Sequence, residues 1–173
     1  MGEAKGQIYQ INVKPETPGE RGIPKFPVES ALVTLQGVEG DFNRYRTEKN
    51  GRDLDSALLL IPYESIQQLN QEGWLVKPGD LGENVTVLGV AYDSFKVGDI
   101  YSLGKNLKIQ ISRPCTACGN LELLQYVGER VKEFVRTLTW KENGKIMNRR
   151  GWYARVLKEG EINKGDLIER IIR

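Results

Sequence analysis

The sequence predicts a mainly β protein, a closed or partly open β-barrel with two minor helices, and three observations lead to this fold class. Short apolar runs rich in β-branched and aromatic residues recur along the chain. Gly-Asp pairs flank several of them, at Gly40, Gly79, Gly98 and Gly165, where glycine tolerates the positive φ of a tight turn. The regular alternation of strands and helices typical of doubly wound and thioredoxin-like folds is missing from the pattern, so a mainly antiparallel barrel is expected.

Eight segments carry the strand pattern and two carry a helical one. The expected strands are residues 6–13, 30–37, 56–61, 84–90, 99–104, 107–112, 152–157 and 166–172. The first expected helix covers residues 62–73 and begins with a proline, and the second covers 120–135 with apolar residues at three-to-four spacing. The polar stretches 15–30 and 40–55 are too long for plain connections, so we expect loops folded over a site.

Composition limits the classes of function. The 173 residues include 25 basic and 23 acidic side chains, 39% hydrophobic residues and no histidine. These values are typical of one globular domain, residues 1–173, and the dispersed charge argues against a nucleic-acid partner. The chain has neither an apolar run of about 18 to 20 residues nor the apolar core of a signal peptide, so we expect a cytoplasmic protein without a membrane partner. The lack of histidine excludes histidine acid–base chemistry and histidine triads.

The two cysteines, Cys115 and Cys118, lie in "SRPCTACGNLELL", where an expected strand gives way to an expected helix. A thiol reacts or binds metal as the thiolate, which helix N-termini and nearby cations stabilise. Asn120 is a candidate N-cap for the expected helix, and Arg113 supplies a cation close by in the sequence. A metal ligand, a redox pair, a sulfur carrier and two buried small hydrophobes all fit these residues.

The order of several segments resembles the MOSC domain, the family named for the C-terminal domain of molybdenum cofactor sulfurases. The segments that carry the resemblance are "GIPKFPVESALVTLQGVEGDFN", "ALLLIPYESIQQL", "PGDLGENVTVLGV", "VGDIYSLGKNLKIQISRPCTAC" and "GWYARVLKEGEINKGDLIE". Together they cover roughly residues 10 to 172, as in a standalone single-domain member. The resemblance implies a mostly β, barrel-like fold of the MOSC type. It also implies a cysteine that carries sulfur as a persulfide or binds the molybdenum of a pterin cofactor.

The same resemblance implies roles for individual residues. Cys118 matches the family's cysteine, the metal ligand or persulfide site, and Cys115 becomes an auxiliary catalytic thiol. The polar residues at motif positions, implied to bind the cofactor, are Asp41, Asn43, Asn84 and Arg113. Many relatives place a histidine and paired glycines after the Gly-Asp turn, where this chain has Asn43 and "KNG", so the cofactor affinity and the substrate are expected to differ.

We therefore expect a protein that binds the molybdenum cofactor (molybdopterin), carries sulfur on Cys118, or does both. The alternatives are a molybdenum-dependent reductase of N-hydroxylated compounds and a non-enzymatic, thiol-bearing binding module, so whether the protein is an enzyme stays open. A pyridoxal phosphate domain is too large for 173 residues, so pyridoxal phosphate would act only in a partner cysteine desulfurase. Other expected partners are an electron-donor protein and, as sulfur acceptor, a molybdoenzyme or another metal centre.

Overall fold

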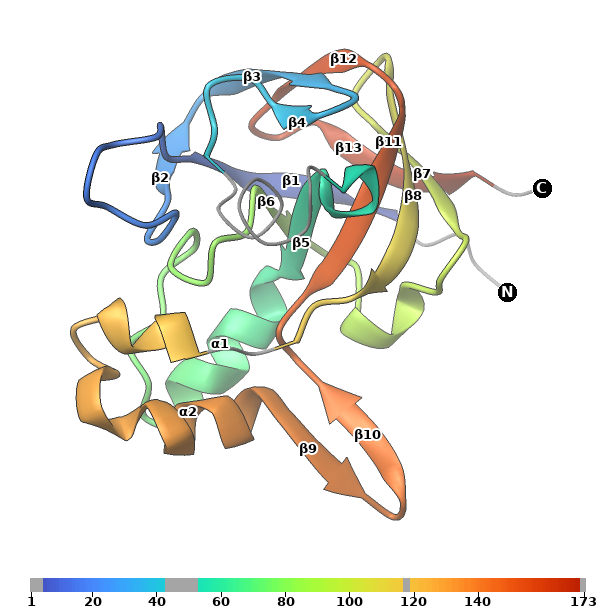
Figure 1. The fold of residues 1–173 in the computed structure, drawn as a ribbon. Helices are drawn as coiled ribbons and strands as arrows, with labels where there is room; N and C mark the ends of the chain where they lie inside the picture. The colour runs from blue at the N-terminus through green and yellow to red at the C-terminus, as the bar shows by residue number, and fades with distance from the viewer. Residues whose placement is uncertain (1–4, 43–52, 117–118, 172–173) are drawn as a thin grey trace.

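A closed barrel forms the centre of the molecule (Figure 1). The computed structural model describes residues 5–42, 53–116 and 119–171. The barrel strands are β1 (Lys5–Val13), β5 (Leu58–Pro62), β6 (Val85–Leu88), β7 (Ile100–Leu103), β8 (Leu107–Pro114), β11 (Trp152–Lys158) and β13 (Leu167–Ile171). They follow the order β13-β7-β8-β11-β5-β6-β1, and the pairing of β1 with β13 closes the ring. The predicted barrel is therefore confirmed in its closed form.

The strand directions confirm the mainly antiparallel arrangement. Neighbouring barrel strands are antiparallel except for β5 and β6, which run parallel. All eight expected strands are found, because the eighth is β3 (Ser30–Thr34) in a small sheet with β4 (Gly37–Val38) and β12 (Gly160–Asn163). That sheet lies over one end of the barrel (Figure 1). The glycines of the four Gly-Asp pairs have φ between 81° and 94°, as the turn pattern predicts.

Alternation along the strands builds the barrel core. In β8 the apolar Leu107, Ile109 and Ile111 are buried, whereas Lys108 between the first two is exposed. Each fully buried side chain of this size contributes about 1.5–3 kcal/mol to the free energy of folding, before the entropy cost of ordering it. The inward-facing residues of all barrel strands form one continuous cluster with β3 and β4.

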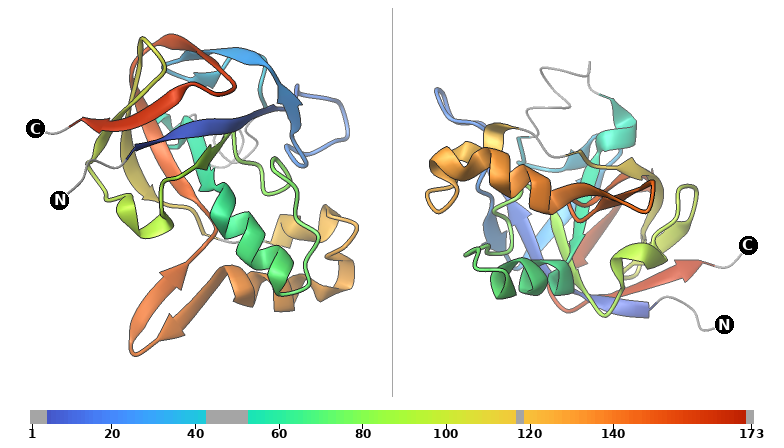
Figure 2. Two further views of the ribbon diagram at one scale, coloured as in Figure 1. Left: turned by 180° about the vertical axis from the view of Figure 1, so that it is seen from behind. Right: turned by 90° about the horizontal axis from the view of Figure 1, so that it is seen from below.

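The helical segments gather below the barrel in Figure 1 and enclose a second core. They are α1 (Tyr63–Gln71), the 3-10 turns η4 (Gly119–Leu123) and η5 (Gly128–Arg130), and α2 (Val131–Leu138). Trp74 and Phe134 meet in this core with ring centroids 4.6 Å apart. The left view of Figure 2 shows the same placement of α1 and α2 below the barrel.

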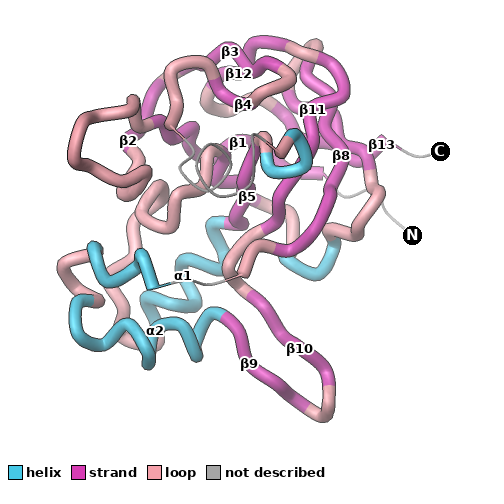
Figure 3. Tube along the Cα trace, in the orientation of Figure 1, coloured by secondary structure: helices cyan, strands magenta, loops and turns pink. Residues whose placement is uncertain are grey.

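The expected helix 62–73 is confirmed as α1, but a single helix over 120–135 is wrong. Figure 3 shows this stretch as short helical pieces separated by loops. The main chain turns back where the amides of Val127 and Gly128 both donate to the carbonyl of Leu124, and Gly128 has a φ of 45°. A left-handed glycine interrupts the α-helix, so the regular helix starts only at Val131.

Several elements were not expected from the sequence. A hairpin of β9 (Thr139–Glu142) and β10 (Lys145–Asn148) projects from the barrel around the positive-φ turn at Asn143 and Gly144 (Figure 1). The strand β2 (Phe26–Val28) lies inside the expected loop 15–30 and pairs with β1. Short 3-10 turns occur at η2 (Leu54–Ser56) and η3 (Tyr92–Ser94). Every helix within the described ranges is too short or too polar to pass through a membrane.

Candidate functional site

Cys115 lies at the end of β8, as the sequence predicts. Its amide donates to the carbonyl of Gly151 at 2.8 Å, which extends the β8–β11 ladder one residue beyond Pro114. The residue is only 3% exposed, and its thiol is directed to the carbonyl of Thr116 at 3.6 Å. Cys115 is thus a buried thiol whose backbone is fixed to a neighbouring strand.

Asn148, the last residue of β10, and residues 149–151, which connect β10 to β11, form a corner beside Cys115. The Asn148 side-chain amide donates to the Cys115 carbonyl at 2.7 Å, and its oxygen accepts from the amide of Arg150 at 2.7 Å. The hydroxyl of Tyr92 donates to the Gly151 carbonyl at 3.1 Å. Burial raises the pKa of Tyr92 well above its usual value, and the nearby Cys115 thiol adds to that shift. We call Cys115, Asn148, Arg150 and Gly151 the Cys115 corner.

Two of the sequence-predicted site residues, Cys118 and Asn43, lie outside the described residues. The described chain on either side of Cys118 corrects one expectation about it. The segment from Gly119 to Leu123 is a 3-10 turn, and the next α-helix begins at Val131. The expected α-helix with Asn120 as its N-cap is therefore wrong.

Arg113 precedes the cysteines on β8 and connects the barrel to η2. Its guanidinium donates to a carboxylate oxygen of Asp53 at 2.9 Å and to the hydroxyl of Ser56 at 2.5 Å. It also lies over the ring of Tyr153, 5.1 Å from the centroid. The side chain is 36% exposed, so the guanidinium both holds η2 in place and faces solvent at the end of the barrel where β8 terminates.

Asp41 and Asn84 contact each other inside a buried ion-pair network. Asn84 donates to one Asp41 oxygen at 2.9 Å, and Lys25 donates to both Asp41 oxygens at 2.7 and 2.9 Å. The Asn84 oxygen accepts from the amide of Leu59, and the amide of Lys14 donates to Asp41. Lys25 and Asp41 side chains are each 4% exposed, and burial lowers the pKa of Lys25 although Asp41 opposes this shift. We call Lys25, Asp41 and Asn84 the Asp41 network.

Glu83 is a fully buried carboxylic acid next to the Asp41 network in the sequence. One of its oxygens accepts from the amide of Gly79 at 2.6 Å and from the hydroxyl of Thr86 at 3.0 Å. The other oxygen is buried and has no hydrogen-bond partner among the described residues. Burial raises the pKa of Glu83 to about 7, so its charge changes near neutral pH.

The structure brings Asp41 and Asn84 together but places Arg113 in a different set of contacts, with Asp53 and Ser56. Sequence reasoning missed Lys25, which looks like one lysine among many surface charges. It also gave no role to Arg149 and Arg150, yet Arg150 is 6% exposed and Arg149 bonds Glu72 and the Thr137 carbonyl. No sequence pattern marks these three residues, because their burial results from packing between distant segments.

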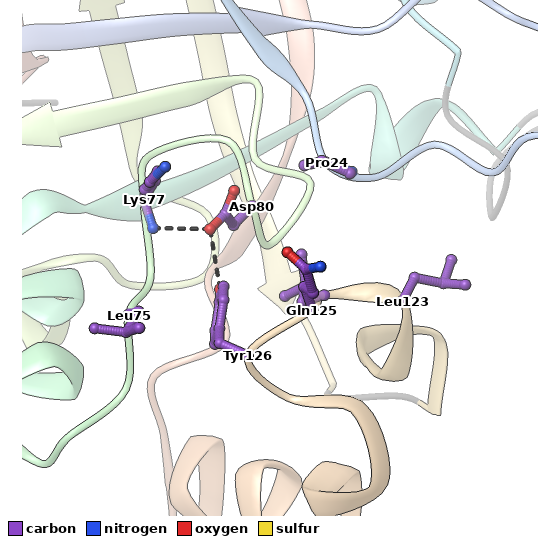
Figure 4. Close-up of a pocket in the computed structure, with 8 residues that line it drawn as sticks. Pro24, Leu75, Lys77, Asp80, Leu123, Gln125 and Tyr126 are labelled. Atoms are coloured by element: carbon purple, nitrogen blue, oxygen red, sulfur yellow. Dashed lines mark hydrogen bonds between the residues drawn. The ribbon is translucent and has the colours of Figure 1, made fainter.

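A pocket of about 500 Å³ lies beside the segment that follows the cysteines (Figure 4). The pocket has mostly apolar surface and is lined by Pro24, Leu75, Lys77, Asp80 and residues 123–126. Asp80 accepts from the Lys77 amide at 2.9 Å and from the Tyr126 hydroxyl at 3.0 Å. Burial raises the pKa of Asp80, and burial followed by the Asp80 charge raises that of Tyr126. The volume is in the range of small-molecule sites.

Few groups of the Cys115 corner are accessible, because Cys115 and Arg150 are only 3% and 6% exposed. Cysteine sulfur is a soft metal ligand, and a guanidinium such as that of Arg113, whose side chain is 36% exposed, matches phosphate oxygens. Among the described residues, no three histidine, cysteine or acidic side chains are placed to hold a metal ion.

Comparison with known proteins gives relatives of different lengths. The uncharacterized protein YflK of Bacillus subtilis (strain 168) is 31% identical over 158 residues, covering 89% of this chain and 65% of YflK. A Gibberella moniliformis protein named Reductase is 33% identical over 95 residues, covering 55% of this chain and 15% of that protein. The chain thus spans less than two thirds of both.

The fold has a solved counterpart. The crystal structure of YiiM from Geobacillus stearothermophilus is 32% identical and superimposes with a TM-score of 0.67, covering 97% of this chain and 76% of that one. The MOSC domain model matches residues 40–169, which include the strands from β5 to β12, the start of β13 and the cysteine segment. This match covers most of the sequence, and the chain therefore belongs to the MOSC domain family.

Proposed function

We propose that the protein binds the molybdenum cofactor and that the Cys118 thiolate is the protein ligand of the metal. The observation that carries the proposal is the fixed end of β8, where Cys115 is bonded to Gly151 and Asn148 three residues before Cys118. The MOSC membership supports it, because that family is associated with this cofactor. When bound, the cofactor would supply the redox chemistry of molybdenum.

Different residues of the chain would contact such a cofactor or support the residues that contact it. Arg113 has a partly exposed guanidinium at the end of β8 and would face the anionic part of the cofactor. Asn43 stays a proposed contact that follows directly on the Asp41 turn. Asp41 and Asn84 would act indirectly, since their side-chain atoms are bonded to Lys25, to each other and to backbone amides. They would hold the turn at residues 40–42 in place.

The test is metal and pterin content in protein expressed with a complete cofactor supply. Cys118→Ser should lose most of the molybdenum and the pterin fluorescence, because serine is a poor ligand for this soft metal. Cys115→Ser is the matched control, since it removes a thiol three residues away that is buried and should keep most of the cofactor. Wild-type occupancy in Cys118→Ser would overturn the proposal.

A reductase activity is the second candidate, supported by the Gibberella relative named Reductase. The pocket lined by Pro24, Leu75, Lys77, Asp80 and residues 123–126 would then take a small, largely apolar substrate near the cysteine segment. The proposed substrates are N-hydroxylated compounds, and a separate electron-donor protein would supply the two electrons. Anaerobic assays with a chemical reductant and an N-hydroxylated amidine test this candidate, and Leu123→Glu at the pocket wall should raise KM.

Sulfur transfer is the third candidate and gives Cys115 a function. A persulfide on Cys118 would be attacked at its inner sulfur by the Cys115 thiolate, which releases hydrosulfide to an acceptor and leaves a Cys115–Cys118 disulfide. The proposed partner is a pyridoxal phosphate-dependent cysteine desulfurase, and the acceptor is a molybdoenzyme or another metal centre. Because Cys115 is 3% exposed, a desulfurase would not load sulfur on it directly, and its thiolate acts only in the release step. We therefore expect Cys115→Ser to slow release more than loading. Mass spectrometry after incubation with a desulfurase and cysteine measures both.

A further inference from the structure

Asp80 and Asp166 occupy the same position in two Gly-Asp turns and make the same local bonds. The Oδ2 atom of Asp80 accepts from the Lys77 amide at 2.9 Å, and the Asp80 amide donates to the Lys77 carbonyl at 3.0 Å. Asp166 makes the same two bonds with Asn163, at 2.8 and 3.0 Å. Each turn uses only one of the two carboxylate oxygens. The turn accounts for the contacts of Asp166, whereas Asp80 makes a further contact.

Asp80 differs from Asp166 because it lines the 500 Å³ pocket. The Tyr126 hydroxyl donates to the same Oδ2 atom at 3.0 Å, so this oxygen accepts two hydrogen bonds. In Figure 4 both dashed lines end on that oxygen, and the other oxygen, Oδ1, points away from Tyr126. Within the described residues, Oδ1 accepts no hydrogen bond. Asp80 is half-buried and therefore offers one carboxylate oxygen to a ligand in the pocket.

The rest of the pocket is mostly apolar. Leu75 and Leu123 belong to its lining although they are 69% and 46% exposed, whereas Leu124 is only 3% exposed. Pro24 adds further apolar surface. Covering exposed leucine side chains with the apolar body of a ligand is favourable, because it removes their surface from water. The pocket therefore favours a ligand with an apolar body and one polar end.

The charges at the pocket indicate the sign of that polar end. Burial raises the pKa of Asp80, because its carboxylate lacks part of the hydration that it would have in water. A cation beside Oδ1 would replace this missing stabilisation. Lys77 also lines the pocket, but it is exposed, and its charge has the smallest influence among the causes that shift the pKa of Asp80. The complementary ligand is thus cationic.

We propose that this pocket binds a small organic cation, with an ammonium group at Oδ1 of Asp80 and an apolar body over Leu75 and Leu123. An ammonium group donates a charge-assisted hydrogen bond to a carboxylate, which is stronger than a bond from a neutral donor. The inference goes beyond the proposed function, because binding requires neither the cofactor nor Cys118. For the reductase candidate it adds that the substrate is positively charged, and in this one respect it rests on that candidate.

The experiment compares two probes, benzylamine and benzyl alcohol. They share the same apolar group, and only the amine is charged at neutral pH. Chemical-shift titrations of the isotopically labelled full chain give both dissociation constants and show which backbone amides respond. Benzylamine should bind the wild type about tenfold more tightly than benzyl alcohol, because hydrogen bonds between charged groups have effects of about this size. The largest shifts are expected at residues 123–126.

Three variants separate the charge from the apolar wall. Asp80→Asn keeps an oxygen for its two bonds and replaces Oδ1 by an amide group, so the Kd of benzylamine should rise about tenfold while that of benzyl alcohol changes less than about twofold. Asp166→Asn is the matched control, because it removes the same charge from the same kind of turn, and both Kd values should stay within about twofold. Leu123→Ala should raise both Kd values by a similar factor.

The outcomes that contradict the inference are distinct. A wild type that binds benzylamine no better than benzyl alcohol, an Asp80→Asn variant with wild-type affinity for benzylamine, equal losses in Asp80→Asn and Asp166→Asn, or a Leu123→Ala variant that affects neither probe would overturn it. If Asp80→Asn does not fold, the comparison of the two probes on the wild type decides. Molybdenum content is measured separately, so failure of this inference and failure of the proposed function are distinguishable.

Discussion

The Asp41 network and the Cys115 corner differ in how they use polar groups. In the Asp41 network, the side chains of Lys25 and Asp41 are 4% exposed and bond to one another. In the Cys115 corner, most contacts are to the main chain, and the side chain of Arg113, two residues before Cys115, is 36% exposed. The difference teaches that the polar motif residues around Asp41 stabilise the fold, while the more exposed Arg113 side chain lies at the end of β8, where the proposed function places the cofactor.

The largest expected effect breaks the Asp41 network. Lys25→Met should lower the free energy of unfolding by about 3–5 kcal/mol, because it leaves the Asp41 carboxylate buried without its cation. Urea unfolding measures the loss. The control is Lys5→Met, which removes an exposed pair with Glu169 and should cost less than about 1 kcal/mol. Equal losses in the two variants would mean that the buried pair stabilises the fold no more than the exposed pair does.

The second expected effect is a pH dependence of the free energy of unfolding, caused by Glu83. Its folded pKa of about 7 lies above its usual 4.5, so the native state binds this proton more tightly than the unfolded chain does. The resulting stability is fully present below about pH 4.5 and is lost as pH rises through 7, up to about 3 kcal/mol at 1.4 kcal/mol per pKa unit.

Glu83→Gln tests this dependence because glutamine has the same shape and does not titrate. Its oxygen can still accept from Gly79 and Thr86. Urea unfolding at pH 5, 6, 7 and 8 should show the stability of the variant rising relative to wild type across this range. A constant difference between the two proteins would show that Glu83 has an ordinary pKa.

The smallest expected effect on stability is that of Arg113→Lys, at the end of β8 that leads to the cysteines. Arg113→Lys keeps the charge but cannot reach Asp53 and Ser56 with the same geometry, so we expect a loss of about 1 kcal/mol in the free energy of unfolding. If Arg113 faces the cofactor, the molybdenum content per folded protein should fall markedly, although the loss in the free energy of unfolding is small. A loss as large as that of Lys25→Met would instead put Arg113 among the groups that hold the fold.

The barrel could be predicted because its strands alternate or are continuously apolar and because glycines mark its turns. The second helix could not, because apolar spacing over 120–135 also fits the separate 3-10 turns that pack Leu121 and Leu124 into the helical core. The hairpin at residues 139–148 was missed although Asn143 and Gly144 form a typical hairpin turn. That signal is present in the sequence and was outweighed by the polar residues around it.

The position of Cys115 in the candidate site could be predicted from the sequence, but most of the contacts around it could not. The strand-end position of Cys115 follows from the pattern that ends at Ser112. The roles of Lys25, Asn148 and Arg150 depend on contacts between segments more than 15 residues apart, which one sequence does not encode in any local pattern. Asp41 and Asn84 were found as polar motif residues, but their mutual bond became visible only in the fold.

Molybdenum content per folded protein, compared between Cys118→Ser and Asn84→Ala, tests the central claim most directly. Both variants and the wild type are expressed with a complete cofactor supply, and circular dichroism confirms that each is folded. If the chemistry lies with the cysteines and the Asp41 network supports the fold, Cys118→Ser loses most of its molybdenum while folded Asn84→Ala keeps most of it. A folded Asn84→Ala that is as empty as Cys118→Ser would contradict this account, because the Asp41 network would then bind the cofactor itself.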